Sequence, residues 1–428
     1  MKRHLNLSSR ASAKGVAVSV FALSVFFVLP LCLCAQKNSC VECHLGLEDT
    51  LKTPAEGFAA DVHKQFGLGC QDCHGGNPAQ EDVELAKDRT FKGSPERAKI
   101  PEFCGSCHSN SEYMRHYNPN LRVDQLALYW TSRHGQLLKK GDTHGAVCID
   151  CHGVHGIQPA NFPKSQVFPW NIPQTCGRCH SNADTMKAYG IPVHQVDDYK
   201  QSVHARALFE KKDLSAPVCN DCHGNHGAAP PEVTSIAFVC RQCHASAGDL
   251  FSKSPHKEAF DSLGMSECEA CHGNHKILPP SDEMLAGGKN DICLQCHDTG
   301  TEPHQTGSKI KKEIDDFVTS SEAAGTLLAS AERKGVEVSE ARFKLQDANT
   351  ALVLARNLTH GLSLAEIEAS LGEGAKTLAE VKVRGEAALR EAKFRRSGLV
   401  IATVFILLLA VALYLKIRDL KRPPTRPE

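Results

Sequence analysis

The sequence predicts a fold in three parts: a domain of short helices and loops with little regular secondary structure, an all-α antiparallel helical region, and a C-terminal transmembrane helix. Three observations carry this prediction. Most of the 20 cysteines recur in one five-residue phrase. The hydrophobic pattern changes near residue 305 from irregular to helical. Residues 398–415 contain no charged side chain and are long enough to cross a membrane.

The recurring phrase is C-x-x-C-H, which occurs nine times. Its members are Cys40, Cys43 and His44; Cys70, Cys73 and His74; Cys104, Cys107 and His108; Cys148, Cys151 and His152; Cys176, Cys179 and His180; Cys219, Cys222 and His223; Cys240, Cys243 and His244; Cys268, Cys271 and His272; and Cys293, Cys296 and His297. Only Cys32 and Cys34 lie outside the phrase, both in the N-terminal apolar segment. No cysteine is therefore left for a structural disulfide.

A histidine directly after every pair is typical of c-type haem attachment. The two thiols form thioether bonds with the porphyrin, and the adjoining imidazole ligates the iron from the proximal side. A zinc half-site or a redox dithiol would explain a C-x-x-C pair, but neither requires histidine at the next position nine times. The sequence therefore predicts nine covalently bound haem c groups. With about 30 residues per haem, these groups must form most of the core of a haem-cored multihaem cytochrome c domain.

The motifs are organised in a repeat. Each of four repeat units begins with a histidine, continues through C-x-x-C-H-G and closes with a second C-x-x-C-H. The units begin at His63, His134, His204 and His256, and the motif at Cys40 stands alone before them. The sequence thus predicts one haem followed by four haem pairs.

Seven histidines recur outside the attachment motifs, and we expect them to be distal iron ligands. Four are the unit-opening histidines. The other three, His155, His226 and His275, follow a proximal histidine by three residues. This is too close to reach the opposite face of the same iron, so a neighbouring haem is the expected target.

Two of the nine irons then remain without a repeated distal histidine. The first unit has Asn77 where the others have the second histidine, so at least one haem there should be served from elsewhere. The candidates for the two vacancies are His116, His144, His194 and His304. A solvent-facing or supporting histidine is the alternative interpretation for each.

The N-terminal segment is typical of a secretory signal. Four basic residues within the first 14 positions precede an apolar run that ends near Cys34, and Ala35 offers a cleavage point. An uncleaved anchor is the alternative. Because haem is attached covalently outside the cytoplasmic membrane, both interpretations place the haem domain in the periplasm.

After residue 304 the pattern becomes helical. Apolar and small residues recur in steps of three and four through residues 310–331, 341–355 and 367–388. Ser363 and Glu366 form a capping-box pattern before the third segment. We expect an antiparallel bundle of three long helices, with His360 as a helix-end residue rather than a ligand.

These patterns divide the chain into five segments. They are a signal segment at 1–35, a nonahaem domain at 36–304, a helical bundle or stalk at 305–396, a transmembrane helix at 397–416, and a short basic cytoplasmic tail at 417–428. We therefore expect a protein of the bacterial cytoplasmic membrane with one C-terminal span.

Charge limits the class of partner. The 49 basic and 49 acidic residues balance, but removal of the four basic residues in 1–35 leaves 45 against 49, and haem propionates add negative charge. An acidic holoprotein argues against nucleic acid as a partner and favours docking to basic redox proteins.

The C-H-G-x-H phrases, preceded by a unit-opening histidine and followed by a second C-x-x-C-H, resemble the doubled haem motif of class III-like multihaem cytochromes c from metal-, sulfur- and nitrogen-respiring bacteria. The resemblance covers residues 40 to about 304. It implies low-potential haems with two histidine ligands in a continuous wire. The helical region with its anchor is similar to membrane-tethered members, which pass electrons between a quinol pool and periplasmic carriers. The small quinol-oxidising cytochromes, in contrast, usually carry an N-terminal anchor.

Two functional classes follow. The first is an electron-transfer wire of anaerobic respiration without catalytic residues, with a membrane quinol-linked donor and periplasmic or outer-membrane cytochromes as acceptors. The second is a multihaem reductase or oxidase of a small nitrogen or sulfur compound, with one haem open on its distal side. All nine motifs are standard, and eleven non-proximal histidines lie between His63 and His304. We therefore expect the wire.

Overall fold

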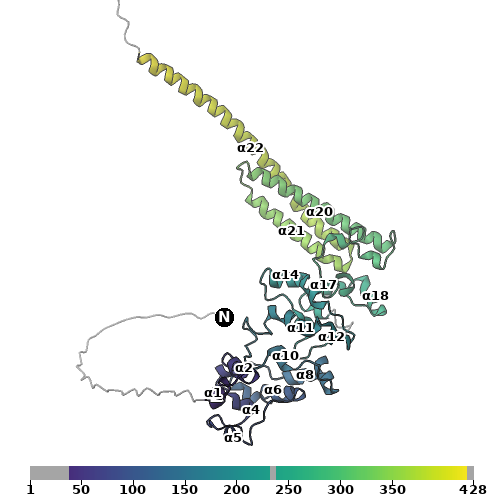
Figure 1. Ribbon diagram of the computed structural model, residues 1–428. Coiled ribbons are helices and arrows are strands. Elements are labelled where there is room, and N and C mark those ends of the chain that lie inside the picture. The colour runs from purple at the N-terminus through teal and green to yellow at the C-terminus, as the bar shows by residue number, and fades with distance from the viewer. Residues whose placement is uncertain (1–37, 232–237, 422–428) are drawn as a thin grey trace, which may run out of the picture. The chain divides into compact units, whose positions relative to one another are not determined.

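The computed structural model describes residues 38–231 and 238–421. The expected signal segment with Cys32 and Cys34, and most of the expected tail, lie outside these residues. Within the two described ranges all regular secondary structure is helical, as the sequence predicted (Figure 1).

Two compact bodies make up the chain. The N-terminal body combines the residues up to Lys52 with Gly69–Gly93, and the main body combines Thr53–Leu68 with the chain from Ser94 onward. The N-terminal body contains α1 (Ser39–Leu45), α4 (Cys70–His74) and α5 (Val83–Ala86). The backbone N–H of Ser39 donates to the Pro78 carbonyl at 2.9 Å, and the Asn38 amide donates to Gln71 at 3.2 Å. The first two attachment motifs are thereby held together.

Short helices build the haem-binding part of the chain. Helices that begin the repeat units are α3 (Val62–Gln65), α9 (Arg133–Lys139), α14 (Val203–Phe209) and α18 (Pro255–Leu263). Attachment motifs of the main body lie on α6 (Ile100–His108), α10 (Cys148–His152), α11 (Ile172–His180), α15 (Cys219–His223), α19 (Glu269–His272) and η4 (Cys293–Gln295). The connecting helices are α2 (Asp49–Phe58), η1 (Arg97–Lys99), α7 (Ser111–Arg115), α8 (Gln125–Thr131), η2 (Pro169–Asn171), α12 (Ala183–Lys187), α13 (Gln195–Lys200), α17 (Ala245–Phe251) and η3 (Asp282–Met284).

Among the described residues of this part, buried apolar side chains form two small clusters. One cluster contains Tyr129, Leu138 and Val147, and the other contains the equivalent residues of the next repeat unit, Tyr199, Leu208 and Val218. Each tyrosine donates its hydroxyl to a backbone carbonyl at 3.0 Å, that of Ala146 and that of Pro217 respectively. The sequence repeat is therefore also a structural repeat, and its side-chain cores are small, as a cofactor-filled interior requires.

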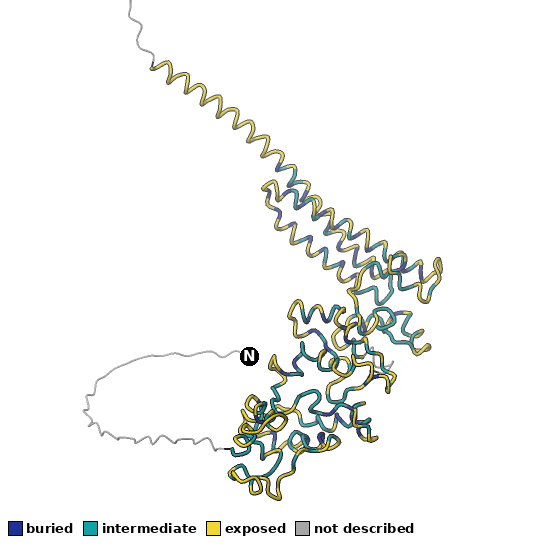
Figure 2. Tube along the Cα trace, in the orientation of Figure 1, coloured by how far each residue is buried: buried dark blue, intermediate teal, exposed yellow. Residues whose placement is uncertain are grey.

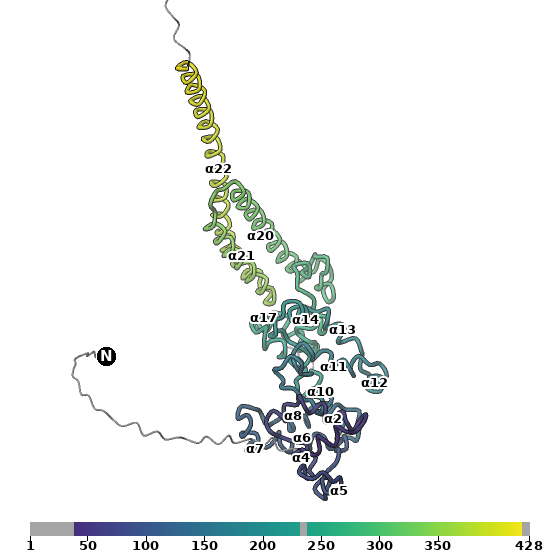
Figure 3. Tube along the Cα trace, turned by 60° about the vertical axis from the view of Figure 1, so that its left-hand side comes forward, coloured from purple at the N-terminus to yellow at the C-terminus, as the bar shows by residue number. Residues whose placement is uncertain are grey.

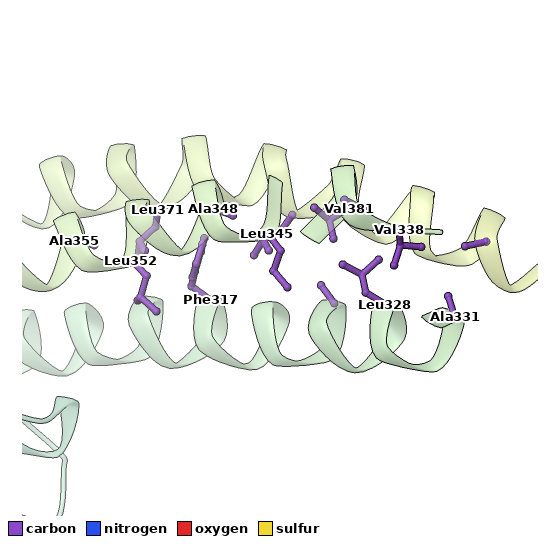
Figure 4. Packing of buried hydrophobic residues seen from close by; sticks show 14 of the residues in the cluster. Phe317, Leu328, Ala331, Val338, Leu345, Ala348, Leu352, Ala355, Leu371 and Val381 are labelled. Carbon is purple, nitrogen blue, oxygen red and sulfur yellow. The ribbon is translucent and has the colours of Figure 1, made fainter. Parts of the chain in front are cut away.

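The C-terminal part is a three-helix bundle of α20 (Glu302–Glu332), α21 (Ser339–Leu358) and α22 (Leu364–Leu420), with the short turn η5 (Thr359–Gly361) between the last two. The residues of the three predicted seams are buried between the helices (Figure 4). Ser363 caps α22 by accepting a hydrogen bond from the Glu366 N–H at 3.4 Å. The predicted bundle is confirmed.

Helix α22 continues beyond the bundle as a single helix whose C-terminal part is exposed along its length (Figure 2). It is the one helix in the described ranges that is long and apolar enough to cross a membrane, and its most apolar window is 0% buried. An exposed apolar surface of this kind is expected for a segment that lies in lipid.

Candidate functional site

Each attachment motif that forms a helical turn presents its three functional side chains together. In an α-helix, positions i, i+3 and i+4 share one face, so both thiols and the imidazole of C-x-x-C-H point to the same side. In α10 the carboxylate of Asp150 accepts a hydrogen bond from the Val147 N–H at 2.7 Å, which caps the turn. Asp72 and Asp221 cap α4 and α15 in the same way, at 2.6 and 2.8 Å. The aspartate of C-x-D-C-H therefore fixes the start of the haem-binding turn.

The cysteines and histidines are arranged for attachment and axial ligation rather than for a zinc centre. None of the 18 motif cysteines forms a disulfide. No group of three or more His, Cys, Asp or Glu side chains converges as a metal site within the described residues. The histidines instead come together two at a time.

The first class of pairs joins the unit-opening histidine to the closing motif of its own repeat unit. The ring centroids are 6.0 Å apart for His63 and His108, 6.2 Å for His134 and His180, 6.3 Å for His204 and His244, and 6.0 Å for His256 and His297. The interplanar angles in this class vary from 77° to 20°.

The second class joins the histidine of a C-H-G-x-H phrase to the first motif of the preceding repeat unit. His226 faces His152 at 6.1 Å, and His275 faces His223 at 5.9 Å. Both pairs are almost parallel, with interplanar angles of 11° and 12°. These histidines thus face a motif other than the one they follow in sequence.

The spacing in both classes fits a haem iron between the two rings. Metal–imidazole bonds of about 2 Å on each side of an iron put the two ring centres roughly 6 Å apart. Rings in ordinary contact would not be expected to share one centroid distance while their interplanar angles differ. The residues present therefore fit haem groups with two histidine ligands.

Burial favours the neutral imidazole at several of the paired rings, and the neutral form is the one that iron ligation requires. Burial, and after it the neighbouring His226, lowers the pKa of His152 to about 4. Burial, followed by the paired ring, likewise lowers the pKa of His134 and of His204. A neutral imidazole retains the nitrogen lone pair that binds a metal.

Carbonyl and carboxylate groups accept hydrogen bonds from Nδ1 of several histidines, and this leaves Nε2 as the nitrogen that can bind iron. The Nδ1–H of His44 donates to the Leu51 carbonyl at 2.7 Å, and that of His74 donates to the Gly93 carbonyl at 2.8 Å. In the main body, His63 Nδ1 lies 2.8 Å from the buried carboxylate of Asp61. Such acceptors fix the tautomer with a hydrogen at Nδ1 and leave Nε2 for the metal.

Successive motifs of the main body are neighbours in space in their sequence order. The closing motif of one repeat unit lies beside the first motif of the next, with neighbouring thiols at Cys104 and Cys148, at Cys176 and Cys219, and at Cys240 and Cys268. The two motifs within a unit are linked as well. In the second unit, burial and, as the next largest cause, the nearby Cys176 raise the pKa of the Cys151 thiol to about 11. In the third unit, Cys240 is the neighbour of Cys222 in the same way.

At the two ends of the motif series the same neighbour relations hold. Burial, and after it Cys296, raises the pKa of the Cys271 thiol, which brings the last two motifs together. In the N-terminal body, Cys40 lies near Cys70 and raises its pKa after the larger effect of burial. The motif at Cys40 therefore takes the place that a closing motif has elsewhere in the repeat.

The structure gives His360 a neighbour that the sequence did not indicate. This residue lies in the turn η5 at the helix end, as predicted, but its ring is not remote from the haem motifs. It stacks on His272 with a centroid distance of 6.1 Å and an interplanar angle of 28°. The sequence carried no signal for this contact, because His360 lies outside the repeat.

The four non-repeated candidates are placed differently from the paired histidines. His304 is buried, and its Nε2 lies 2.9 Å from Asp291. His194 is exposed, with Nε2 3.6 Å from Asp198, and His144 is exposed beside Asp142. His116 is exposed at the end of α7. Within the part of the chain that the structure describes, the rings of these four histidines are not among those that pair with a proximal histidine at 5.9–6.3 Å.

Known families match the same regions. Residues 62–181 match the family described as cytochrome c3, and residues 262–302 match the doubled CXXCH motif. The C-type polyheme cytochrome OmcC of Geobacter sulfurreducens is 23% identical over 212 residues, which cover 44% of this chain. The alignment covers 26% of that relative, so this chain spans only about a quarter of its length. No solved structure matches the chain.

Helical turns that carry C-x-x-C-H, together with paired imidazoles at haem spacing, define a c-type cytochrome with several haems. The chain is a multihaem c-type cytochrome with doubled attachment motifs and a cytochrome c3-like domain.

Proposed function

We propose that this protein is a nonahaem electron-transfer wire, anchored in the cytoplasmic membrane by α22 with its haem domain in the periplasm. It passes electrons in anaerobic respiration between a membrane quinol-linked donor and periplasmic or outer-membrane cytochromes. Bound haem supplies the one-electron chemistry. The chain's own residues attach the haems, ligate them and set their order.

The pairing of histidines is the observation that carries this proposal. Seven proximal histidines are each faced by a second histidine at 5.9–6.3 Å. Two imidazoles fill both axial positions of an iron and leave no position for a substrate. A chain of such sites supports conduction rather than catalysis.

The repeat extends the assignment to His155. This residue corresponds to His226 and His275, so it should likewise be the distal ligand of a neighbouring haem. The same rule gives a reason for Asn77. In the later units, the second histidine of C-H-G-x-H faces the first motif of the preceding unit. A histidine at position 77 would therefore serve a first motif that precedes His63, but the motif in that place, at Cys40, is of the closing type. Under this pairing rule, and contrary to the expectation from the sequence repeat, Asn77 leaves no haem of the first unit without a ligand.

The positions of the basic residues and of the exposed apolar surface support the proposal that α22 anchors the protein in the membrane. The exposed apolar part of α22 is preceded by basic residues and followed by basic residues. Because haem attachment takes place outside the cytoplasm, the haem domain and the tail should lie on opposite sides of the membrane. An acidic haem domain supports docking to basic partners.

One observation favours a second candidate function. The motif at Cys40 corresponds to a closing motif. In each repeat unit, the histidine that opens the unit is the proposed distal ligand of the closing motif. No such histidine precedes Cys40 in the haem domain, so the repeat supplies no distal ligand for this haem. An open front haem could reduce or oxidise a small nitrogen or sulfur compound.

A count of haems and of spin states tests both candidates. Mass spectrometry and the pyridine haemochrome assay should give nine haems per chain. Magnetic circular dichroism should then show at most one high-spin haem. Two or more high-spin haems in fully loaded protein would contradict the wire. Turnover of nitrite, hydroxylamine or tetrathionate by a single high-spin haem would establish the second candidate instead.

A further inference from the structure

The first haem of the last repeat unit has no following unit to supply its distal ligand. The first motifs of the second and third units, at His152 and His223, face histidines from the C-H-G-x-H phrases of the units after them. The fourth unit, with its first motif at His272, is followed by the helical bundle. By the rule of the repeat, this position should be vacant.

His360 of the bundle lies where the missing histidine would be. Its distance to His272, 6.1 Å, falls within the range of the other pairs, and its interplanar angle of 28° lies between the 20° and 39° of two pairs of the first class. The separation and angle of the two rings therefore match those of the paired histidines of the repeat.

The tautomer of His360 is also that of an iron ligand. Its Nδ1 lies 2.9 Å from the carbonyl oxygen of Asn357, which can only accept a hydrogen bond. Nδ1 must therefore carry the hydrogen, and Nε2 keeps its lone pair. In contrast, His304 and His194 have Nε2 beside a carboxylate. Of these three histidines from outside the repeat, only His360 leaves Nε2 for a metal.

Several contacts hold the His360 turn against the haem-binding segment. The side chain of Asn357 donates to Ser246 at 2.6 Å, and the Arg356 guanidinium pairs with Asp282 at 2.6 Å. A side chain at Gly361 would meet Leu250 of α17 at 3.7 Å, so the turn packs closely there. Figures 1 and 3 show α17 beside the end of the bundle. Ser246, Leu250 and Asp282 all lie between His244 and Cys293, in the segment that carries the motif of His272. These contacts hold the turn of His360 against that segment.

We propose that His360 is the distal ligand of the haem attached at Cys268 and Cys271, so that the helical bundle completes the last haem pair. The inference rests on the proposed haem binding. Its consequence is that the bundle does more than connect the haem domain to the membrane. It supplies an iron ligand, and separation of the bundle from the haem domain would open that iron.

The test uses the full-length protein with His360→Ala. All nine haems should remain attached, because Cys268, Cys271 and His272 are unchanged. One additional high-spin haem per chain should appear and bind carbon monoxide. Thr359→Ala, which changes the neighbouring residue of the same turn and leaves every histidine in place, is the matched control and should leave the spin-state count unchanged. An unchanged high-spin count in His360→Ala would overturn the proposal.

A second variant separates ligand loss from misfolding. His360→Gly should also produce one additional high-spin haem, and free imidazole should convert it back to low spin, because the imidazole can occupy the space of the missing ring. A new high-spin signal that imidazole does not reverse would show a displaced turn and would contradict direct ligation. A haem count below nine in the parent protein would instead contradict the proposed nonahaem function, so the two failures are distinguishable.

Discussion

The carboxylate of Asp61 lies 2.8 Å from Nδ1 of His63 and fixes the ring that faces His108. The same carboxylate accepts hydrogen bonds from the N–H groups of Gly156, at 2.6 Å, and Ile157, at 2.8 Å. Burial by itself would raise the pKa of Asp61, but these hydrogen bonds outweigh it and lower the pKa to about 2. One side chain therefore orients a proposed ligand and joins two repeat units.

Asp61→Ala should weaken the ligation of the haem at His108. Loss of a supporting carboxylate typically weakens metal ligation roughly 10–100-fold, so part of this haem should become high-spin and bind carbon monoxide. Asp142→Ala is the matched control, because Asp142 holds the exposed His144 through the same D-x-H arrangement. Equal spectra for the two variants would show that Asp61 has no role in orienting a ligand.

His226→Ala should open the haem at His152. Nine haems should remain, since the attachment residues are intact, and one should change from low to high spin. The electron paramagnetic resonance signal that is lost should be that of a site with nearly parallel ligand planes, because these rings differ by only 11°. If the low-spin signals are unchanged, His226 is not an axial ligand and the pairing rule fails.

Leu328→Ala tests the core of the bundle. Leu328 is 0% exposed, and a cavity at such a position costs about 2–5 kcal/mol. Thermal unfolding of the full-length protein in detergent, followed by circular dichroism, should show a lower midpoint for the helical signal. Phe343→Ala, at a side chain 65% exposed, should change stability by less than about 0.5 kcal/mol. A similar loss in both variants would contradict the assigned core.

Truncation after Lys393 tests the anchor. Without the apolar part of α22, the haem-loaded protein should be released from membranes in soluble form. The measurement is the distribution of covalent haem between membrane and soluble fractions after a high-salt wash. Haem that stays with the membrane would indicate a second anchor, and residues 1–35 are the segment that could supply it.

Much of this organisation was predictable from local pattern. Both cysteines and the histidine of an attachment motif lie within five residues, so a single helical turn brings them together without help from the rest of the fold. The bundle seams were predictable for a similar reason, since a period of three and four residues places Ile314 and Leu328 on one helix face. The orientation of His63 by Asp61 was missed, although the two residues are close in sequence, because aspartate in that position is also an ordinary helix cap.

The sequence by itself determined the number of attachment motifs, the repeat, the three bundle helices and the apolar span, because each depends on residues that are near one another in the chain. Tertiary structure decided which histidine faces which motif. Partners such as His152 and His226, or His272 and His360, are far apart in sequence and meet only when successive repeat units and the bundle pack together. The physical reason is that axial ligation needs two rings on opposite sides of one iron, and the second ring can come from any part of the chain that the fold brings within about 6 Å.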